Sequence, residues 1–455
     1  MSSKNYELDM CNGPLLTKIL IFAIPLMLSG ILQLLFNATN MVVAGRYIGP
    51  MALAAIGSTS SLTNLLVNLF IGLSVGSSVT VSHYYGAGKE KDVSETVHTA
   101  ILLSLIGSLF LALFSIVFAR EFLTLMGTPS DVLPLATTYM RVYFAGIPAI
   151  LLYNFGSSIL RAIGDTRRPL FILLIAGTVN VALNLLFVLV FHLGVAGTAF
   201  GTILSECVSS TLVILCLIRS QGCIHLNLRR LRIYPDKLKR ILRIGLPAGI
   251  QGSIFSISNV LIQSSVNSFG SVAMAGNTAT MNLEGFIYTS MNSLYQTSLS
   301  FTGQNMGAKK HKRILRILLL CLFLVIIVGS GMGFAGLFFG RHLLGIYTSD
   351  PTAINYGIAR MEIIFITYSL CGIMDVTVGS LRGMGHSVVP MFVSLMGACG
   401  LRILWIFTVF AHARTLPSLY VSYPVSWAIT ASIHLICFVY AYRKLRRSDR
   451  EKCTV

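Results

Sequence analysis

Long apolar blocks recur along the whole chain, and no other feature constrains its fold as strongly. A helix needs about 20 apolar residues to cross a lipid bilayer. Twelve blocks of at least that length occur, near 15–43, 52–81, 97–119, 135–158, 169–191, 196–218, 244–268, 275–302, 314–339, 356–380, 388–411 and 421–442. Only 11% of the residues are charged, against about 25% in soluble domains, and the blocks are continuous where a β-barrel would alternate. The sequence therefore predicts an all-α membrane protein with twelve transmembrane helices.

The basic residues are concentrated on one side of the predicted membrane. If the N-terminus is placed in the cytoplasm, 27 of the 34 Lys and Arg residues fall in cytoplasmic segments. Arg402 falls within a span, and the six on the outer side are Arg46, Arg120, Arg141, Arg341, Arg360 and Arg414. Because cytoplasmic loops carry such an excess of positive charge, both termini are predicted to be cytoplasmic. This topology explains the net charge of +18, and no nucleic-acid partner is predicted.

The chain repeats itself at a nearly constant offset. Ser77–Lys89 reads SSVTVSHYYGAGK, and Ser298–Lys310 reads SLSFTGQNMGAKK, 221 residues later. Leu160–Gly164 reads LRAIG and returns as LRGMG at Leu381–Gly385, again offset by 221. An offset kept over a whole half of the chain indicates an internal duplication of six helices each.

The duplication predicts two lobes of the same topology, because six helices return the chain to its starting side. The N-terminal lobe is placed at 1–218, a basic cytoplasmic linker at 219–243 and the C-terminal lobe at 244–455. The linker and the tail after residue 442 are expected to meet anionic lipid headgroups. Two matching lobes suit alternating access to a central cavity, although a duplication can also build a mere scaffold.

Cofactor and metal motifs are missing from the sequence. The nine cysteines include no CxxC pair and no Cys/His cluster, so neither a disulfide framework nor a zinc site is predicted. The glycines of Gly86–Gly88 lack the spacing and the Lys-Ser/Thr of a phosphate-binding loop. No cofactor is predicted. The polar residues 1–12 run directly into the first span, which predicts that this span is retained.

The repeated loops resemble those of one transporter family. The two LRxxG-x4-P loops and the GA-K loop with its QNMGAKK echo are similar to loops of the multidrug and toxic-compound extrusion (MATE) transporters. The stretch IGLPAGIQGSIFSISNVLIQ at Ile244–Gln263 is similar to the seventh helix of their bacterial DinF-like branch. The resemblance implies two six-helix lobes around a V-shaped central cavity. It also implies export of organic, often cationic compounds by antiport with Na⁺ or H⁺.

Polar side chains inside spans are candidates for contact with substrate, because they are costly in lipid. In the N-terminal lobe these are Gln33, Asn37, Asn40, Tyr139, Asn154, Asn180 and Asn184. The resemblance implies carboxylates at the positions of Asn40 and Asn184, and this chain has amides there. An amide cannot release a proton, although its carbonyl oxygen can ligate Na⁺. Asn40, Asn180 and Asn184 are therefore candidate Na⁺ ligands, with hydrogen bonding between helices as the alternative.

Glu206 is the acid that the sequence offers to the N-terminal lobe. It lies twelve residues from Ile218 at the inner end of its span, which is ~18 Å deep at 1.5 Å per residue. We hypothesise that Glu206 replaces the missing carboxylates in ion coupling. The alternative is a permanently protonated or Arg-paired Glu.

The C-terminal lobe carries a stripe of polar, Met and Tyr side chains on its second span. Met281, Glu284 and Tyr288 share one face with Asn277. Aromatic rings, a flexible thioether and one carboxylate suit a flat organic cation, so the three are assigned to substrate binding and an unpaired Glu284 also to ion coupling. Core packing is the alternative. Asp375 is a further ion-coupling candidate, which pairs either with Arg402 or elsewhere.

These expectations together describe a secondary active multidrug exporter. It couples the export of cationic or amphiphilic organic compounds to H⁺ or Na⁺ antiport by rocker-switch alternating access. It is expected to be a monomer in a bacterial inner membrane. One alternative is a lipid-linked saccharide flippase of the same superfamily. A membrane enzyme is the alternative from another class, and it would need clustered Asp, His or Cys near an interface; no such cluster occurs, so the chain is predicted not to be an enzyme.

Overall fold

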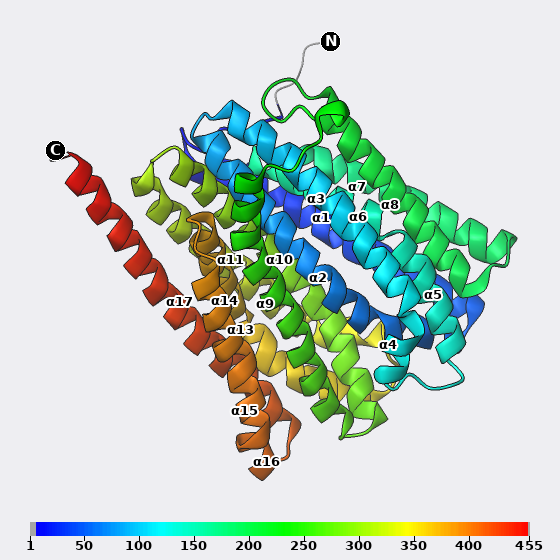
Figure 1. Cartoon of the computed structure of the whole chain (residues 1–455). Coiled ribbons are helices and arrows are strands. Elements are labelled where there is room, and N and C mark those ends of the chain that lie inside the picture. The colour runs from blue at the N-terminus through cyan, green and yellow to red at the C-terminus, as the bar shows by residue number, and fades with distance from the viewer. Residues whose placement is uncertain (1–5, 454–455) are drawn as a thin grey trace. The chain divides into compact units, whose positions relative to one another are not determined.

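The computed structural model describes residues 6–453, and every regular element in that range is helical (Figure 1). The contacts divide the chain into two compact units. Unit 1 comprises Met1–Leu8 and Leu28–Ser253, and unit 2 comprises Asp9–Met27 and Ile254–Val455. Each unit has its own set of long helices and is described separately below.

Unit 1 contains the second part of α1 (Leu15–Val43) and the first part of α9 (Pro235–Asn267). Its other elements are η1 Ala44–Ile48, α2 Pro50–Gly86, α3 Glu90–Val117, α4 Ala119–Leu125, α5 Leu133–Ala145, α6 Ile147–Ala162, α7 Arg167–Leu185, η2 Leu186–Val190, α8 Gly194–Arg219 and η3 Leu228–Arg230. Apolar side chains of α2, α3, α6 and α8 form its core, with Val97, Phe155 and Val213 fully buried. This packing fixes the interior faces of α7 and α8.

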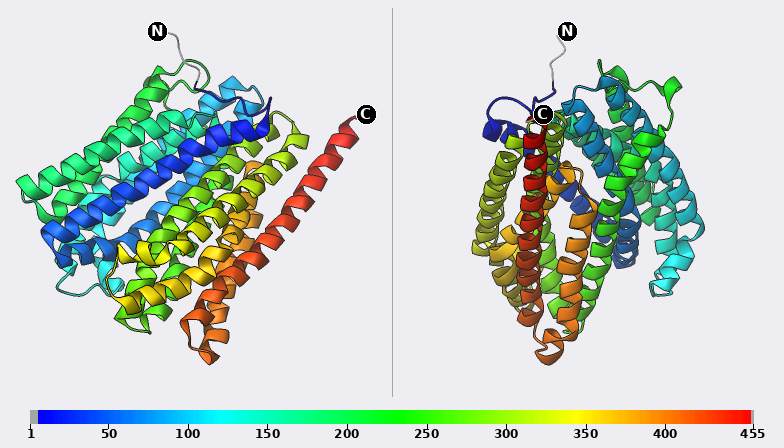
Figure 2. Two further views of the ribbon diagram at one scale, coloured as in Figure 1. Left: turned by 180° about the vertical axis from the view of Figure 1, so that it is seen from behind. Right: turned by 60° about the vertical axis from the view of Figure 1, so that its left-hand side comes forward.

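Unit 2 contains the first part of α1 and the second part of α9. Its other elements are α10 Ser271–Gly307, α11 His311–Phe338, α12 Gly340–Gly345, α13 Pro351–Gly383, α14 Val388–Ser394, η4 Leu395–Gly400, α15 Leu401–Phe407, α16 Val409–His412 and α17 Leu416–Cys453. Helix α13 packs between α10, α11 and α17. Figure 2 shows α17, in red, continuing as one helix into the basic C-terminal segment.

The predicted spans are recovered with small changes. Ten helices in the described range are long and apolar enough to cross a membrane, and α5 with α6, bent by 46°, makes an eleventh. The remaining predicted block, 275–302, corresponds to α10, which has 37 residues and a more polar composition. Its length exceeds what a span needs, but it is not among the helices apolar enough to cross a membrane, so a span at 275–302 stays a prediction.

Two helices are shared between the units. The division falls between Met27 and Leu28 in α1, close to Pro25, and between Ser253 and Ile254 in α9. A proline inside a helix removes one backbone hydrogen bond and permits a bend. The contacts thus split both helices, whereas the predicted division into 1–218, 219–243 and 244–455 leaves α1 whole and cuts α9 nearer its start, at 243/244.

The backbone carries the duplication that the sequence predicts. Gly164 and Gly385 end equivalent loops with φ of 99° and 92°. Gly88 has φ of 68°, and its counterpart Lys309 keeps φ of 56° although it is not glycine. Left-handed φ values are rare for residues with a side chain, so the loop geometry is a property of the repeat and not of glycine alone.

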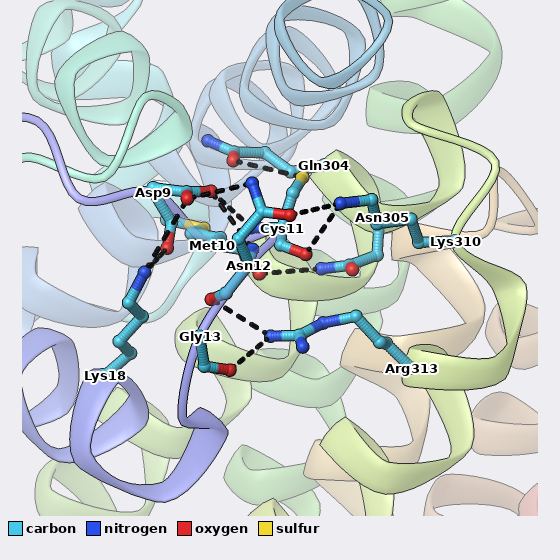
Figure 3. A network of polar contacts seen from close by, with 10 residues as sticks. All are labelled: Asp9, Met10, Cys11, Asn12, Gly13, Lys18, Gln304, Asn305, Lys310 and Arg313. Atoms are coloured by element: carbon cyan, nitrogen blue, oxygen red, sulfur yellow. Dashed lines mark hydrogen bonds and ion pairs between the residues drawn. The ribbon is translucent and has the colours of Figure 1, made fainter.

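The segment Asp9–Gly13 is bound to unit 2 by the repeated QNMGAKK loop (Figure 3). The Asn305 amide donates to the Met10 carbonyl at 3.0 Å, and the Lys310 ammonium donates to the Cys11 carbonyl at 3.2 Å. Lys310 also donates to the Asn12 side chain. The loop motif therefore has a structural task in the second half, where it holds the start of the chain.

Candidate functional site

Three asparagines of unit 1 form a buried hydrogen-bonded cluster. The Asn184 amide nitrogen, on α7, donates to Asn40 Oδ1 of α1 at 2.5 Å and to Asn180 Oδ1 at 3.2 Å. The Asn180 amide nitrogen in turn donates to Ser205 Oγ of α8 at 3.1 Å. Asn184 is fully buried, and Asn180 is 5% exposed. The amides that stand in the places of family carboxylates thus bind one another.

The amide cluster has few free oxygen atoms with which to bind a cation. The Asn40 and Asn180 carbonyl oxygens already accept hydrogen bonds from Asn184. Asn184 Oδ1 is buried without a hydrogen-bond partner among residues 6–453 and lies against Gly201. Na⁺ needs several oxygen ligands, which an amide nitrogen cannot replace. The arrangement fits an interhelix contact, and sodium binding at Asn40, Asn180 and Asn184 stays a prediction.

The other predicted residues of unit 1 lie apart from the cluster. Gln33 and Asn37 are exposed on α1. The Asn154 amide donates to the Ile150 carbonyl of its own helix at 2.9 Å. Tyr139 stacks on Tyr143 with ring centroids 6.0 Å apart. The structure therefore brings Asn40, Asn180 and Asn184 together, and it places Tyr139 in an aromatic pair on α5.

Glu206 of α8 lies near Tyr143, one member of this aromatic pair. Its carboxylate accepts a hydrogen bond from Ser209 at 3.1 Å, one turn along α8. Tyr143 and Tyr153 are close enough to interact with its charge. Ser205, its neighbour in sequence, is the residue that joins the amide cluster. The ion pairs among the described residues do not include Glu206, so an Arg-paired Glu is not observed.

Glu284 of unit 2 is paired, contrary to the prediction of a free carboxylate. Arg360 on α13 donates Nε to Glu284 Oε1 at 2.6 Å and Nη2 to Oε2 at 2.9 Å. Both residues are buried, with exposures of 2% for Arg360 and 9% for Glu284. Arg360, which the charge count assigned to the outer side, lies buried within α13. Two-point pairing holds the guanidinium in a fixed plane, and it neutralises the charge that was assigned to a cationic substrate.

A polar network surrounds this ion pair. Asn277 Oδ1 accepts from Arg360 Nη1 at 2.8 Å and from the Tyr420 hydroxyl at 3.3 Å. The Asn277 amide nitrogen donates to Gln263 Oε1 at 2.9 Å and lies 3.4 Å from Met281 Sδ. The predicted face of α10 is thus built around Asn277, which links α9, α10, α13 and α17.

Asp375 and Arg402 do not form the ion pair that was one of the two predicted alternatives. Arg402 Nε donates to Ser426 Oγ of α17 at 2.9 Å. Asp375 lies close enough to Tyr288 for the two groups to interact electrostatically. Tyr288 and Met281 are each 43% exposed on α10. Unit 2 therefore presents the exposed side chains of Met281 and Tyr288, and its two charged groups, Asp375 and Arg402, are separate from each other.

The sequence contains a signal for the start of the helix that carries Arg360. Asp350 caps α13 by accepting a hydrogen bond from the Thr352 amide at 2.8 Å, and Pro351 occupies the first turn. Asp followed by Pro at a helix start is a recognised N-terminal pattern. A helix that begins at Pro351 places Arg360 nine residues past its start, whereas the apolar block that begins at 356 places it only four residues past.

Comparisons with known proteins find one family in both halves. The sequence model of the MatE family matches residues 25–186 and again residues 247–408. The chain is 26% identical over 432 residues to the probable multidrug resistance protein YoeA of Bacillus subtilis, covering 93% of this chain and 92% of that protein. It is 25% identical over 358 residues to an FAD transporter of Shewanella oneidensis, covering 76% and 78%.

Solved structures confirm the predicted fold class. An outward-facing multidrug resistance MATE family transporter of the MOP superfamily matches with a TM-score of 0.91 at 20% identity. The match covers 98% of this chain and 100% of that chain. The two-lobe helical fold is therefore shared along the whole described chain.

Proposed function

This chain belongs to the MATE family, and from that premise we propose that it is an exporter of amphiphilic organic compounds driven by proton antiport. Members of the family are multidrug transporters and not enzymes, and this chain is a multi-pass protein of a bacterial membrane. Its cytoplasmic termini, monomeric state and contact with anionic headgroups are part of the proposal. They are supported by the charge bias of the sequence and by the family resemblance.

The observation that carries the coupling proposal is the state of the intramembrane acids. Glu206 and Asp375 have no basic side chain within ion-pair distance among residues 6–453. Glu284 is neutralised by Arg360, and the family carboxylates near Asn40 are amides. An acid without a counter-charge can take up and release a proton during transport, whereas a paired acid or an amide cannot. Each unit keeps one acid outside any ion pair, although the positive charge of Arg382 acts on Asp375 from a longer distance.

The residues that we propose to contact substrate are the predicted ones whose side chains are exposed. Gln33 and Asn37 on α1 and Met281 and Tyr288 on α10 are the predicted polar, thioether and aromatic side chains that remain exposed. They offer hydrogen bonds and apolar contact without charge. The expectation of a cationic cargo rested on a free Glu284 and on the family resemblance, and the Arg360 pair removes the first of these grounds.

Transport in proteoliposomes tests the proposal. We expect wild-type protein to move rhodamine 123 or fluorescein when a proton gradient is imposed, and a sodium gradient alone to move neither. Glu206→Gln and Asp375→Asn should each lose most of the proton-driven flux, because a glutamine or asparagine cannot carry the proton. Glu121→Gln and Glu362→Gln, at exposed carboxylates, serve as matched controls and should keep it.

Two outcomes would contradict the proposal. Flux driven by sodium and unchanged in both acid variants would place the coupling elsewhere and favour the amide cluster. Failure of every dye to move under either gradient would contradict multidrug export and favour a lipid-linked saccharide as cargo.

A further inference from the structure

The buried charge of unit 2 is mostly positive. Arg360, Arg382 and Arg402 are 2%, 6% and 3% exposed. Glu284 neutralises Arg360, and Arg382 Nη1 donates to the Tyr295 hydroxyl at 2.8 Å. Arg402 has the neutral Ser426 as its hydrogen-bond acceptor, at 2.9 Å. The positive charge of Arg402 is therefore not neutralised by any ion pair among the described residues.

The Arg402 guanidinium also has an unused donor. Its Nη2 is buried and has no hydrogen-bond partner among residues 6–453. A buried donor without an acceptor is costly and is uncommon in native proteins. A charged residue inside a membrane span usually marks a site of function. An anionic ligand would accept a hydrogen bond from this unused N–H and balance the charge of the buried guanidinium.

Aromatic rings complete the surroundings of Arg402. Its Cζ lies 4.2 Å from the ring centroid of Tyr423 and 5.5 Å from that of Trp427. Trp427 packs edge-on against Tyr423 and Tyr368 at 5.6 Å and 5.3 Å. These rings stabilise the guanidinium through their π faces, and they leave its net charge in place.

The backbone directly before Arg402 is irregular. The helix winds as a wide π turn over Leu395–Gly400, and α15 starts at Leu401. Turns of this kind occur mostly as single insertions and often at functional sites. Tyr423, on the facing α17, is partly exposed, so the aromatic group reaches the surface of unit 2.

We propose that unit 2 recognises a cargo that joins a flat ring system to an anionic group, with Arg402 Nη2 binding the anion and Tyr423 contacting the ring. The inference deepens the proposed export function and rests on it. A carboxylate or a phosphate would fill the unused N–H and balance the buried charge. An organic cation would meet the Arg402 charge without a carboxylate to offset it.

Two dyes of opposite charge on the same ring system test this inference. Fluorescein is an anionic xanthene, and rhodamine 123 is a cationic one. We expect proton-driven uptake of fluorescein into proteoliposomes to exceed that of rhodamine 123. Arg402→Gln should lower fluorescein uptake about tenfold or more, the loss expected for a hydrogen bond to a charged group. Uptake of rhodamine 123 by the variant should be unchanged or higher.

The chain offers a local reporter and matched controls. It has two tryptophans, so in a Trp405→Phe background the emission reports on Trp427 alone. Fluorescein should quench this emission, and Arg402→Gln should abolish the saturable part of the quenching. Arg402→Lys keeps the charge and should retain part of the fluorescein uptake. Arg414→Gln, at an exposed arginine, should behave as wild type. Wild-type selectivity needs no variant, so a poorly folded Arg402→Gln leaves the test intact.

The outcomes separate this inference from the export proposal. Wild-type protein that moves rhodamine 123 but not fluorescein would keep the exporter and overturn the anionic cargo. Fluorescein uptake that survives Arg402→Gln would overturn the role of Arg402. Protein that moves neither dye would contradict the export function as well.

Discussion

At the residue scale, the Glu284–Arg360 pair determines how unit 2 tolerates charge. Glu284→Gln leaves the buried Arg360 guanidinium without its counter-charge. Breaking one partner of a buried pair costs about 3–5 kcal/mol, so the variant should unfold at a clearly lower temperature in detergent. The double variant Glu284→Leu/Arg360→Met should recover most of the loss, because apolar replacements of both partners are often neutral. A single variant as stable as wild type would contradict the pairing.

Asn184 allows a second test at the same scale. Asn184→Asp removes the amide nitrogen that binds the Asn40 and Asn180 carbonyl oxygens, and it supplies a carboxylate beside them. Those oxygens then resemble a cation site. We expect Na⁺, but not choline, to raise the melting temperature of this variant, while wild type does not respond. Asn154→Asp, outside the cluster, is the control. A wild-type response of equal size would show that the amides already bind sodium.

The helix face on which a polar residue lies was easier to predict from sequence than the residue to which it hydrogen-bonds. The faces that bring Asn180 and Asn184 together follow from helical spacing alone. The bonds between amides do not, because Ser205 and Asn40 come from other helices. The pairing of Arg360 with Glu284 could not be predicted for a related reason. A charged residue breaks the apolar pattern that marks a span, and it is the carboxylate of another helix that permits its burial.

At the element scale, the C-terminal end of α10 and the loop after it bind the segment Asp9–Gly13. Asn305→Ala removes the hydrogen bond to the Met10 carbonyl and should loosen Asp9–Gly13. Burial raises the pKa of the half-buried Cys11 thiol, so release should lower that pKa and expose more thiolate, the reactive form. In a background with Cys11 as the single cysteine, maleimide labelling should become several-fold faster. Asn355→Ala, at an exposed helix start, should leave the rate unchanged.

Element boundaries show where hydropathy stops being informative. The block 196–218 agrees closely with α8, Gly194–Arg219. The block 356–380 starts five residues after α13, because Asp350 and Pro351 set the start through capping and not through apolarity. Helix α10 spans enough length but carries polar residues that pack inside unit 2. Helix caps and tertiary contacts therefore set the helix boundaries that the apolar pattern does not determine.

At the scale of the whole molecule, the duplicated halves share a backbone plan and differ in chemistry. Equivalent loops keep left-handed φ at Gly164 and Gly385. Yet unit 1 buries a cluster of amides, and unit 2 buries three arginines, of which Arg360 pairs with Glu284. A constant offset could be predicted from the sequence, because loop motifs survive duplication. The chemical difference between the two units could not be predicted, because it depends on which side chains meet inside each unit.

The topology of the whole molecule gives the last prediction. The sequence places 27 of the 34 Lys and Arg residues in predicted cytoplasmic segments, and this bias predicts cytoplasmic termini. In a cysteine-free background, Gln221→Cys in the linker should react with a membrane-impermeant maleimide only after the cells are opened. Ser130→Cys, between α4 and α5, should react on intact cells. Both positions are exposed and uncharged, so neither substitution alters the charge bias. Labelling of residue 221 on intact cells would reverse the orientation and contradict cytoplasmic termini.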